Sequence, residues 1–175
     1  MTDGIEIVAH EVRRLAIPVT TTFDEFRARY EVAVPALRVE KLDEFKRAGA
    51  DWDTVLRATA ENAPNGFIRY WGSDVESLMR LAGPSRPCVE YLMGNHTIAQ
   101  RMYRHNPAVM LHAPLRTVIH QDHADRVWFT LDQPSTCFGS FGDARIAAVG
   151  HELDAKVAVL LEVLGLPVPA ELAAA

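Results

Sequence analysis

The strongest pattern in the chain is a long amphipathic stretch close to its C-terminal end. From about Asp143 to Leu164 apolar residues return at helical spacing, and Gly165 and Pro167 follow them. These apolar positions are Ile146, Val149, Leu153, Val157, Leu160 and Leu164. The spacing predicts one helix with a continuous apolar face, and Gly and Pro are typical of the point where a helix ends. The rest of the fold must offer this helix an apolar surface.

A β-hairpin is predicted just before this helix. Residues 109–121 and 126–132 have the composition of two strands, and the polar residues Asp122–Asp125 between them form a turn. Further strands are predicted at residues 11–19, 67–71 and 88–93.

Helix starts are marked by capping residues. In a capping box a hydroxyl accepts a hydrogen bond from a backbone N–H while a carboxylate three residues later reaches back. Two pairs have this spacing, Thr22 with Glu25 and Ser73 with Glu76. Asp51 and Asn95 are expected to cap two more helices. Residues 133–142 are predicted to form a loop.

The resulting order of elements is β-α-α-β-α-β-α-β-β-α. It mixes helices with hairpin strands without a strict βαβ alternation. This order predicts an α+β fold with helices packed on one face of a mainly antiparallel sheet. We expect a single domain over residues 1–175, since a domain commonly holds about 100–200 residues.

The second face of this sheet is left without a helical cover. Alternation is expected to place Phe67, Arg69 and Trp71 on one face of their strand. Trp71 and Trp128 cannot then both lie on the core side together with their neighbours. The second face needs a cover of its own, and we predict a homodimer.

Composition narrows the classes of partner. The chain carries 18 Lys and Arg against 23 Asp and Glu, a net charge of −5, whereas a nucleic-acid-binding face must be basic enough to neutralise phosphates. No apolar run reaches the roughly 20 residues that cross a bilayer, and the first residues lack a signal-peptide pattern. Two cysteines make no disulfide framework. We therefore expect a cytoplasmic protein with no nucleic-acid partner and no membrane partner.

Familiar catalytic motifs are absent from the sequence. It contains no phosphate-binding loop, no Gly-x-Gly-x-x-Gly, no Gly-x-Ser-x-Gly and no Cys-x-x-Cys. We expect no organic cofactor, and no metal either, because a metal site needs three or four converging ligands. Three concentrations of polar residues are left as candidate sites.

The first candidate is Gly94–Asn95–His96, at a predicted helix start. A free helix N-terminus offers unpaired amides and a partial positive charge to a carboxylate or a phosphate. His96 lies in the first turn, where it could donate to such an anion. The alternative is that Asn95 only caps the helix and that His96 is solvated.

The second candidate is a row of cationic side chains on the predicted hairpin. Alternation places His112, Arg116 and His120 on one face. There they would line a ligand, or a neutral imidazole would act as acid or base. The alternative is a structural network with carboxylates such as Asp122 and Asp132.

The third candidate is the segment 132–142. Its glycines allow a close approach of the backbone to a ligand, and Phe138 could close over an apolar group. The alternative is an ordinary loop that plugs the edge of the core. Arg69 is a further candidate, because an inward arginine needs either a carboxylate such as Glu90 or an anionic ligand.

Four short runs occur in a recognisable order. They are residues 21–25 (Thr-Thr-Phe-Asp-Glu), 94–95 (Gly-Asn) followed by Ala99 and Asn106-Pro107, 110–114 (Met-Leu-His-Ala-Pro), and 132–135 (Asp-Gln-Pro-Ser). In these runs the chain resembles the family called domain of unknown function 302. The resemblance implies a compact α+β fold similar to the TATA-box-binding-protein-like arrangement, often paired as a dimer. It implies no established activity.

The chain also departs from the pattern of that family. Many relatives carry a Cys after the Gly of the second run and another after the Pro of the third. Here those places hold Asn95-His96 and Leu115, so a thiol or redox role is not expected. Residues 38–64 look longer than in short relatives, which makes them a candidate helical insertion and pocket wall. Residues 166–175 form a C-terminal tail.

The function expected from these residues is the binding of a small molecule of unknown identity, partly apolar and with a polar or anionic end. The ligand-binding candidates are Arg69, Asn95, His96, His112, Arg116 and Phe138, and the catalytic candidates are His96, His112 and His120. The first alternative is a small isomerase, cyclase or lyase that uses a histidine as general acid or base. The second is an oligomeric interaction module with no pocket.

Overall fold

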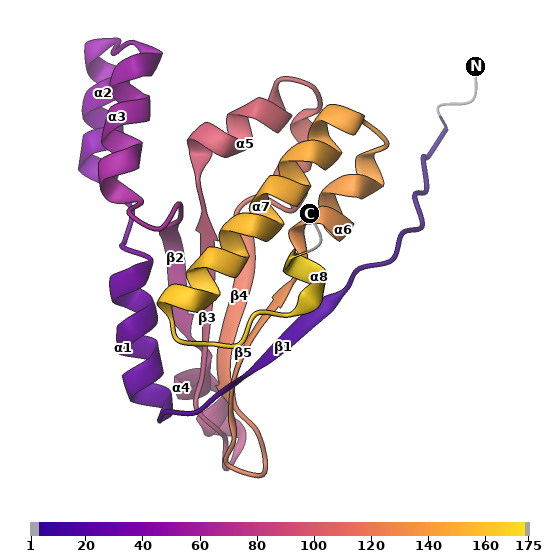
Figure 1. Cartoon of the computed structure of the whole chain (residues 1–175). Coiled ribbons are helices and arrows are strands. Elements are labelled where there is room, and N and C mark those ends of the chain that lie inside the picture. Colours follow the sequence, from indigo (N-terminus) through magenta and orange to yellow (C-terminus); the bar gives the residue numbers. More distant parts are fainter. Residues whose placement is uncertain (1–3, 174–175) are drawn as a thin grey trace.

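A five-stranded sheet forms the centre of the molecule, whose computed structural model describes residues 4–173 (Figure 1). Its strands are β1 (Arg14–Val19), β2 (Ile68–Asp74), β3 (Cys88–Gly94), β4 (Leu115–Gln121) and β5 (Val127–Asp132). They lie in the order β1-β5-β4-β3-β2, and all neighbouring pairs are antiparallel. The predicted α+β class with an antiparallel sheet is confirmed.

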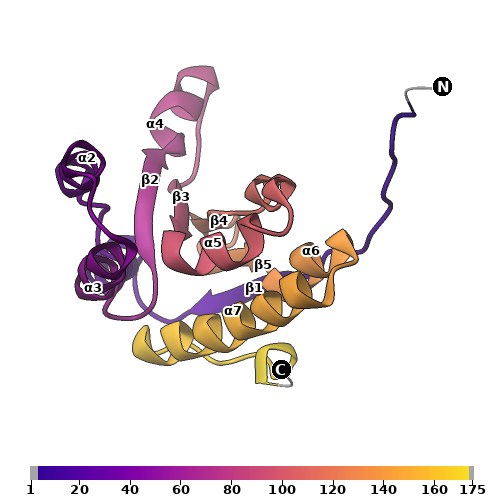
Figure 2. The ribbon, with the colours of Figure 1, turned by 90° about the horizontal axis from the view of Figure 1, so that it is seen from above.

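Helices and short 3-10 turns connect the strands. They are α1 (Phe23–Ala33), α2 (Val39–Ala48), α3 (Trp52–Asn62), α4 (Val75–Met79), η1 (Arg80–Ala82), α5 (His96–Tyr103), η2 (Pro107–Leu111), α6 (Pro134–Phe138), η3 (Gly139–Phe141), α7 (Ala144–Val163) and α8 (Ala170–Ala173). Seen from above, α5 and α7 run side by side along the sheet, and α4 lies away from both, beyond the end of β2 (Figure 2). None of the described helices is both long and apolar enough to cross a membrane.

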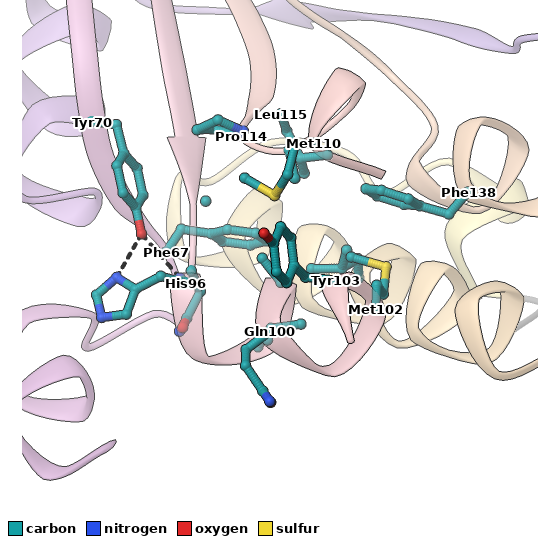
Figure 3. A pocket seen from close by; sticks show the side chains of 16 residues that line it. Phe67, Tyr70, His96, Gln100, Met102, Tyr103, Met110, Pro114, Leu115 and Phe138 are labelled. Atoms are coloured by element: carbon teal, nitrogen blue, oxygen red, sulfur yellow. Dashed lines mark hydrogen bonds between the residues drawn. The ribbon is translucent and has the colours of Figure 1, made fainter. Parts of the chain in front are cut away.

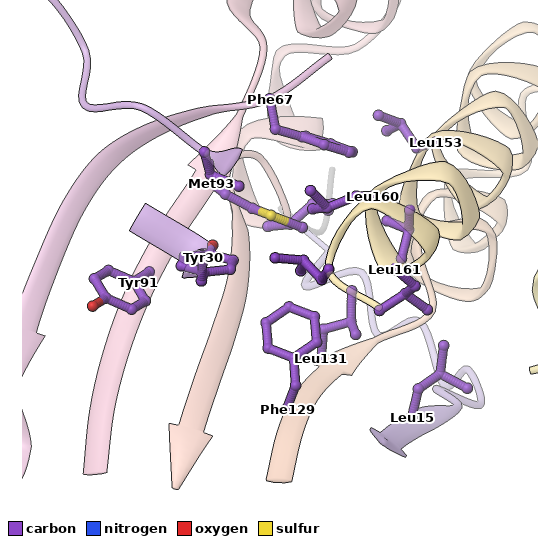
Figure 4. Packing of buried hydrophobic residues seen from close by; sticks show 14 of the residues in the cluster. Leu15, Tyr30, Phe67, Tyr91, Met93, Phe129, Leu131, Leu153, Leu160 and Leu161 are labelled. Carbon is purple, nitrogen blue, oxygen red and sulfur yellow. The ribbon is translucent and has the colours of Figure 1, made fainter. Parts of the chain in front are cut away.

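The core fills the space between the sheet and α7. Leu153, Leu160 and Leu161 of α7 are buried, and they lie opposite Phe129 and Leu131 of β5 (Figure 4). The amphipathic stripe thus meets the apolar surface that it requires. Burial of each such side chain stabilises the fold by about 1.5–3 kcal/mol.

Helix α1 covers a second part of the same face. Tyr30 is fully buried and stacks on Tyr91 of β3 with 5.0 Å between the ring centroids. Its hydroxyl shares a 3.0 Å hydrogen bond with the hydroxyl of Thr117 on β4. Because both polar groups are buried, each satisfies the other without water.

Most predicted helix starts are confirmed, and one is wrong. Thr22, Asp51 and Asn95 cap α1, α3 and α5 through their side chains. The predicted Ser73 capping box does not form. Asp74 caps α4 instead, since its carboxylate accepts a 3.1 Å hydrogen bond from a backbone N–H in the first turn. The strand β2 ends at Asp74, three residues beyond the predicted end at Trp71.

A β-bulge in β2 overturns the predicted facing of its side chains. Arg69 pairs with Met93, whereas Trp71 pairs with the adjacent residue Leu92, so Tyr70 has no partner of its own in the ladder. Successive residues of a strand face opposite sides. Arg69 and Trp71 therefore lie on opposite faces, not on the shared face predicted from simple alternation.

Two segments have a different structure from the one predicted. Residues 107–111, predicted in part as strand, form η2, and β4 begins only at Leu115 after a cis Ala113-Pro114 bond. The predicted loop at residues 133–142 contains α6 and η3. Pro at the first position of α6 and the capping Asn106 before η2 favour these short helices.

The segment 38–64 forms the helices α2 and α3, which stand together above the end of β2 (Figure 1). Asn62 anchors them, because its side chain donates to the carbonyl of Ala36 at 3.1 Å and accepts from the backbone N–H of Arg38 at 3.2 Å. After α7, the tail returns to the body of the protein, where Leu172 of α8 is buried.

The sheet face that points away from α7 is uncovered by other described elements. Arg116, Val118 and His120 face this side and stay partly or largely exposed. Trp71 is 48% exposed, and the half-buried Trp128 donates its indole N–H to Asp122 at 3.0 Å. Each of the two tryptophans thus contributes apolar surface to the uncovered face.

Candidate functional site

A cavity of about 340 Å³ lies between α5, η2 and the adjoining ends of β3 and β4. Most of its lining is apolar, and Figure 3 shows the side chains around it. The main apolar contributors are Phe67, Met102, Met110, Pro114, Leu115 and Phe138. Asn95, His96 and Phe138 are the predicted site residues that this cavity brings together.

His96 is held at the edge of the cavity by hydrogen bonds to both of its ring nitrogens. Nδ1 lies 2.7 Å from the hydroxyl of Tyr70, and Nε2 lies 2.7 Å from the hydroxyl of Thr59. The Thr59 hydroxyl donates its own hydrogen to the carbonyl of Val55. It must therefore accept from Nε2–H, which leaves Nδ1 to accept from the Tyr70 hydroxyl. This arrangement fits a neutral imidazole.

The surroundings of this pair favour the uncharged form of both side chains. Burial lowers the pKa of His96 below its ordinary value. Burial also raises the pKa of Tyr70 to about 12, against a smaller opposite effect of the hydrogen bond from the His96 backbone. Because both ring nitrogens of His96 already have partners within the protein, neither is available to a ligand in this arrangement.

The predicted anion site at the start of α5 is filled by the protein's own groups. The backbone N–H of His96 donates to the Tyr70 hydroxyl at 2.9 Å, and that of Thr97 donates to the Asn95 carboxamide at 3.0 Å. The Asn95 amide itself donates to the carbonyl of Gly66. Because the N–H groups of His96 and Thr97 are already hydrogen-bonded, they are not free to bind an anion.

His112 lies apart from His96, in the wall of a second cavity of about 330 Å³. Its ring meets Phe138 and Phe141 edge-on, with centroids 6.2 Å and 6.0 Å away, and it meets His10 in the same manner. Burial and the charge of His10 lower the pKa of His112, against a smaller opposite effect of Asp132. Met110, Pro114 and Leu115 line both cavities.

The predicted row of His112, Arg116 and His120 does not form. His112 precedes β4, so strand alternation does not apply to it. Arg116 lines the second cavity with His112, but its guanidinium pairs with Glu90 at 2.9 Å. His120 is further along the uncovered face, opposite Trp128, and its Nδ1 is buried without a hydrogen-bond partner in the described part of the chain.

Arg69 lies outside both cavities. The carboxylate of Glu90, proposed as its partner, is engaged by Arg116 instead. The Arg69 guanidinium lies over the ring of Tyr91, 5.4 Å from its centroid, an arrangement in which the ring face attracts the cation. Its Nε is buried without a hydrogen-bond partner among residues 4–173.

Sequence reasoning missed Tyr103, Met110 and Gln100 as cavity residues. The apolar spacing of a helix or a strand does not distinguish a residue that faces the packed core from one that faces a cavity. Among the described residues, no cluster of His, Cys, Asp and Glu could hold a metal. Cys88 and Cys137 are both free, and burial raises the pKa of each thiol.

Comparison with known proteins places the fold. No curated protein matches the chain. The crystal structure of an uncharacterized conserved protein DUF302 from Bacillus stearothermophilus is similar, with a TM-score of 0.62 and 18% identity. The match covers 86% of this chain and 97% of that chain. At this identity the likeness shows the fold alone.

The sequence itself matches the family model described as "Domain of unknown function DUF302" over residues 46–164. This region holds β2 to β5, α5, η2, α6 and the whole of α7, and so all the elements that surround the apolar cavity. The chain therefore belongs to the DUF302 family.

Proposed function

We propose that the protein binds a small, largely apolar molecule in the cavity beside α5. The proposal is supported by the volume of this cavity together with its mainly apolar lining. About 340 Å³ is within the range of known ligand pockets, roughly 300–1,000 Å³. An apolar cavity of this size loses contacts that a packed core would have made, and a ligand restores them.

The polar end of such a ligand has few partners in the cavity. Tyr70, Asn95 and His96 already have hydrogen-bond partners. The hydroxyl of Tyr103 and the side-chain amide of Gln100 are the other polar groups of the lining. Tyr103 is half exposed, so a polar or anionic head group would lie at the rim while the apolar part points inward.

The test uses 1-anilinonaphthalene-8-sulfonate, an aromatic probe with one anionic group whose fluorescence rises in apolar surroundings. Ala99 lines the cavity and is half-buried, whereas Ala148 is exposed on α7. The substitution Ala99→Phe should fill the cavity and weaken binding of the probe about tenfold or more. The control Ala148→Phe should leave the affinity for the probe unchanged. Equal affinity of both variants, or no saturable binding to the wild-type protein, would contradict the proposal. A native mass spectrum of protein purified from its own host would then identify a retained ligand.

An enzyme is the second candidate, and His112 favours it. This histidine is half-buried in the wall of a cavity, and burial favours its neutral form. Its ring contacts Phe138 and Phe141 edge-on, and no hydrogen bond to its ring nitrogens is found among residues 4–173. A neutral imidazole with free nitrogens can act as a general base. If the protein is an isomerase, cyclase or lyase, His112→Ala should abolish the conversion of a metabolite in host extract while retaining the fold.

We also propose that the protein is a homodimer in which the uncovered sheet face, with Trp71 and Trp128, is buried. The support is the exposed apolar area of that face, since Trp is enriched in the buried centre of interfaces. Light scattering at micromolar concentration should give about twice 19.4 kDa. A monomer would contradict this proposal. The cytoplasmic location stays a prediction.

A further inference from the structure

Three exposed apolar side chains gather where α5 ends and η2 follows. Tyr103 is 50% exposed, Met110 is 46% exposed and Leu111 is 82% exposed. These three residues are called the η2 tip below. Large apolar side chains that cluster on a surface commonly mark an interaction site, whereas single ones carry no such meaning.

Two residues of the η2 tip belong to the wall of the apolar cavity. Tyr103 and Met110 are themselves part of the cavity lining and lie close together in Figure 3. Met110 and Leu111 also line the second cavity. A partner that covers the η2 tip therefore also covers two lining residues of the cavity beside α5.

The charge around the η2 tip is unlike that of the whole chain. The protein has a net charge of −5, yet the sequence contains no Asp or Glu between Glu90 and Asp122. Of the arginines in this stretch, Arg101 and Arg116 pair with glutamates. Arg104 is exposed; among residues 4–173 its guanidinium has no ion pair, and its Nε donates to His105 at 3.4 Å. The exposed apolar groups of the η2 tip thus lie next to an arginine without an ion pair, while the carboxylate of Asp132 lines the second cavity together with Met110 and Leu111.

We propose that the η2 tip docks on the surface of an anionic lipid bilayer. Tyr103, Met110 and Leu111 enter the boundary between head groups and acyl chains, and Arg104 meets the anionic head groups. The inference rests on the proposed function. Docking in this orientation turns the cavity toward the bilayer, so that an apolar ligand passes between the cavity and the bilayer without crossing water. Surface docking needs no membrane-spanning helix, but it departs from the sequence-based expectation of no membrane partner.

The experiment measures co-sedimentation with vesicles of phosphatidylcholine that contain one third phosphatidylglycerol. Leu111→Asp should weaken binding about tenfold or more, because one buried leucine contributes that much. The matched control is Leu81→Asp. Leu81 is 83% exposed in η1, also a 3-10 turn, and outside the η2 tip. Arg104→Gln should weaken binding about fivefold on these vesicles and not on pure phosphatidylcholine.

Titration with 1-anilinonaphthalene-8-sulfonate in the absence of vesicles separates this inference from the proposed function. Leu111→Asp should retain the affinity for the probe while it loses vesicle binding. Wild-type protein that stays in the supernatant, or variants Leu111→Asp and Leu81→Asp that sediment alike, would overturn the docking proposal even if the probe binds. Absence of probe binding would instead overturn the cavity function.

Discussion

Tyr70 and His96 are joined by two hydrogen bonds that run in opposite directions. The Tyr70 hydroxyl lies 2.7 Å from Nδ1 of His96, to which it donates, and it accepts from the backbone N–H of the same histidine at 2.9 Å. One phenol thereby fixes the orientation of the imidazole and satisfies a free N–H at the start of α5. Through Nε2 and Thr59, the same imidazole ties α3 to this helix.

Removing this phenol should destabilise the protein. Tyr70→Phe leaves the ring in place but strands a partly buried nitrogen and a backbone N–H, so the free energy of unfolding should fall by about 1–3 kcal/mol. Urea unfolding followed by circular dichroism measures the change. Tyr103→Phe is the control, since Tyr103 is 50% exposed, and it should change stability by less than about 0.5 kcal/mol. Equal effects would show that the Tyr70 bonds are weak.

Stability should depend on pH through His96 and His112. Burial lowers the pKa of both below the ordinary 6.5, so the unfolded chain binds more protons than the folded protein once the pH falls below about 6.5. The free energy of unfolding should therefore decrease from that pH toward the lower folded-state pKa. His96→Gln should reduce the difference between urea midpoints at pH 7.5 and pH 5.5. The exposed His123→Gln should leave it unchanged.

Asp154 should be among the most sensitive positions of α7. It is fully buried and accepts from the side-chain amide of Gln133 at 2.7 Å and from the backbone N–H of Ser135 at 2.9 Å. Asp154→Ala strands both donors and should lower stability by at least about 2 kcal/mol. Glu152→Ala breaks two surface ion pairs, with Arg101 and with Lys156, and should lower stability by about 1 kcal/mol or less. Thermal or urea unfolding of the two variants tests the contrast.

His112→Ala should have a small effect on stability. The ring contacts Phe138, Phe141 and His10 by its edges, and no hydrogen bond to it is found in the described part of the chain. The loss should therefore be below about 1 kcal/mol, as for an ordinary residue outside the core. A decrease of 1–3 kcal/mol in a thermal melt would mean that the histidine has a buried polar partner, and it would remove His112 from the candidate site.

Local signals predicted most of the fold. The stripe of α7 and the capping residues Thr22, Asp51 and Asn95 depend on neighbours within a few residues, and such patterns are visible in one sequence. The turn of residues 122–125 is of the same kind. One error arose where two local signals conflict. Residues 109–111 have apolar character that suits a strand, but the capping Asn106 and Pro107 start a 3-10 turn that includes them.

The candidate site was predictable only in part. Asn95, His96 and Phe138 do line the cavity, yet the sequence could not show that Tyr70 and Thr59 occupy both nitrogens of His96. Those partners come from β2 and α3, distant in the chain. The row of His112, Arg116 and His120 failed because the strand starts after His112. Whether a polar residue is free or already bonded depends on packing, which periodicity does not encode.

The bulge in β2 has a consequence for the length of that strand. Arg69 pairs with Met93 and Trp71 with the next residue, Leu92, so the ladder would continue without a break if Tyr70 were deleted. The sheet therefore does not need this residue, whereas His96 does. The extra residue in β2 is therefore explained by the hydrogen bonds that Tyr70 makes to His96 at the edge of the cavity, and not by strand pairing.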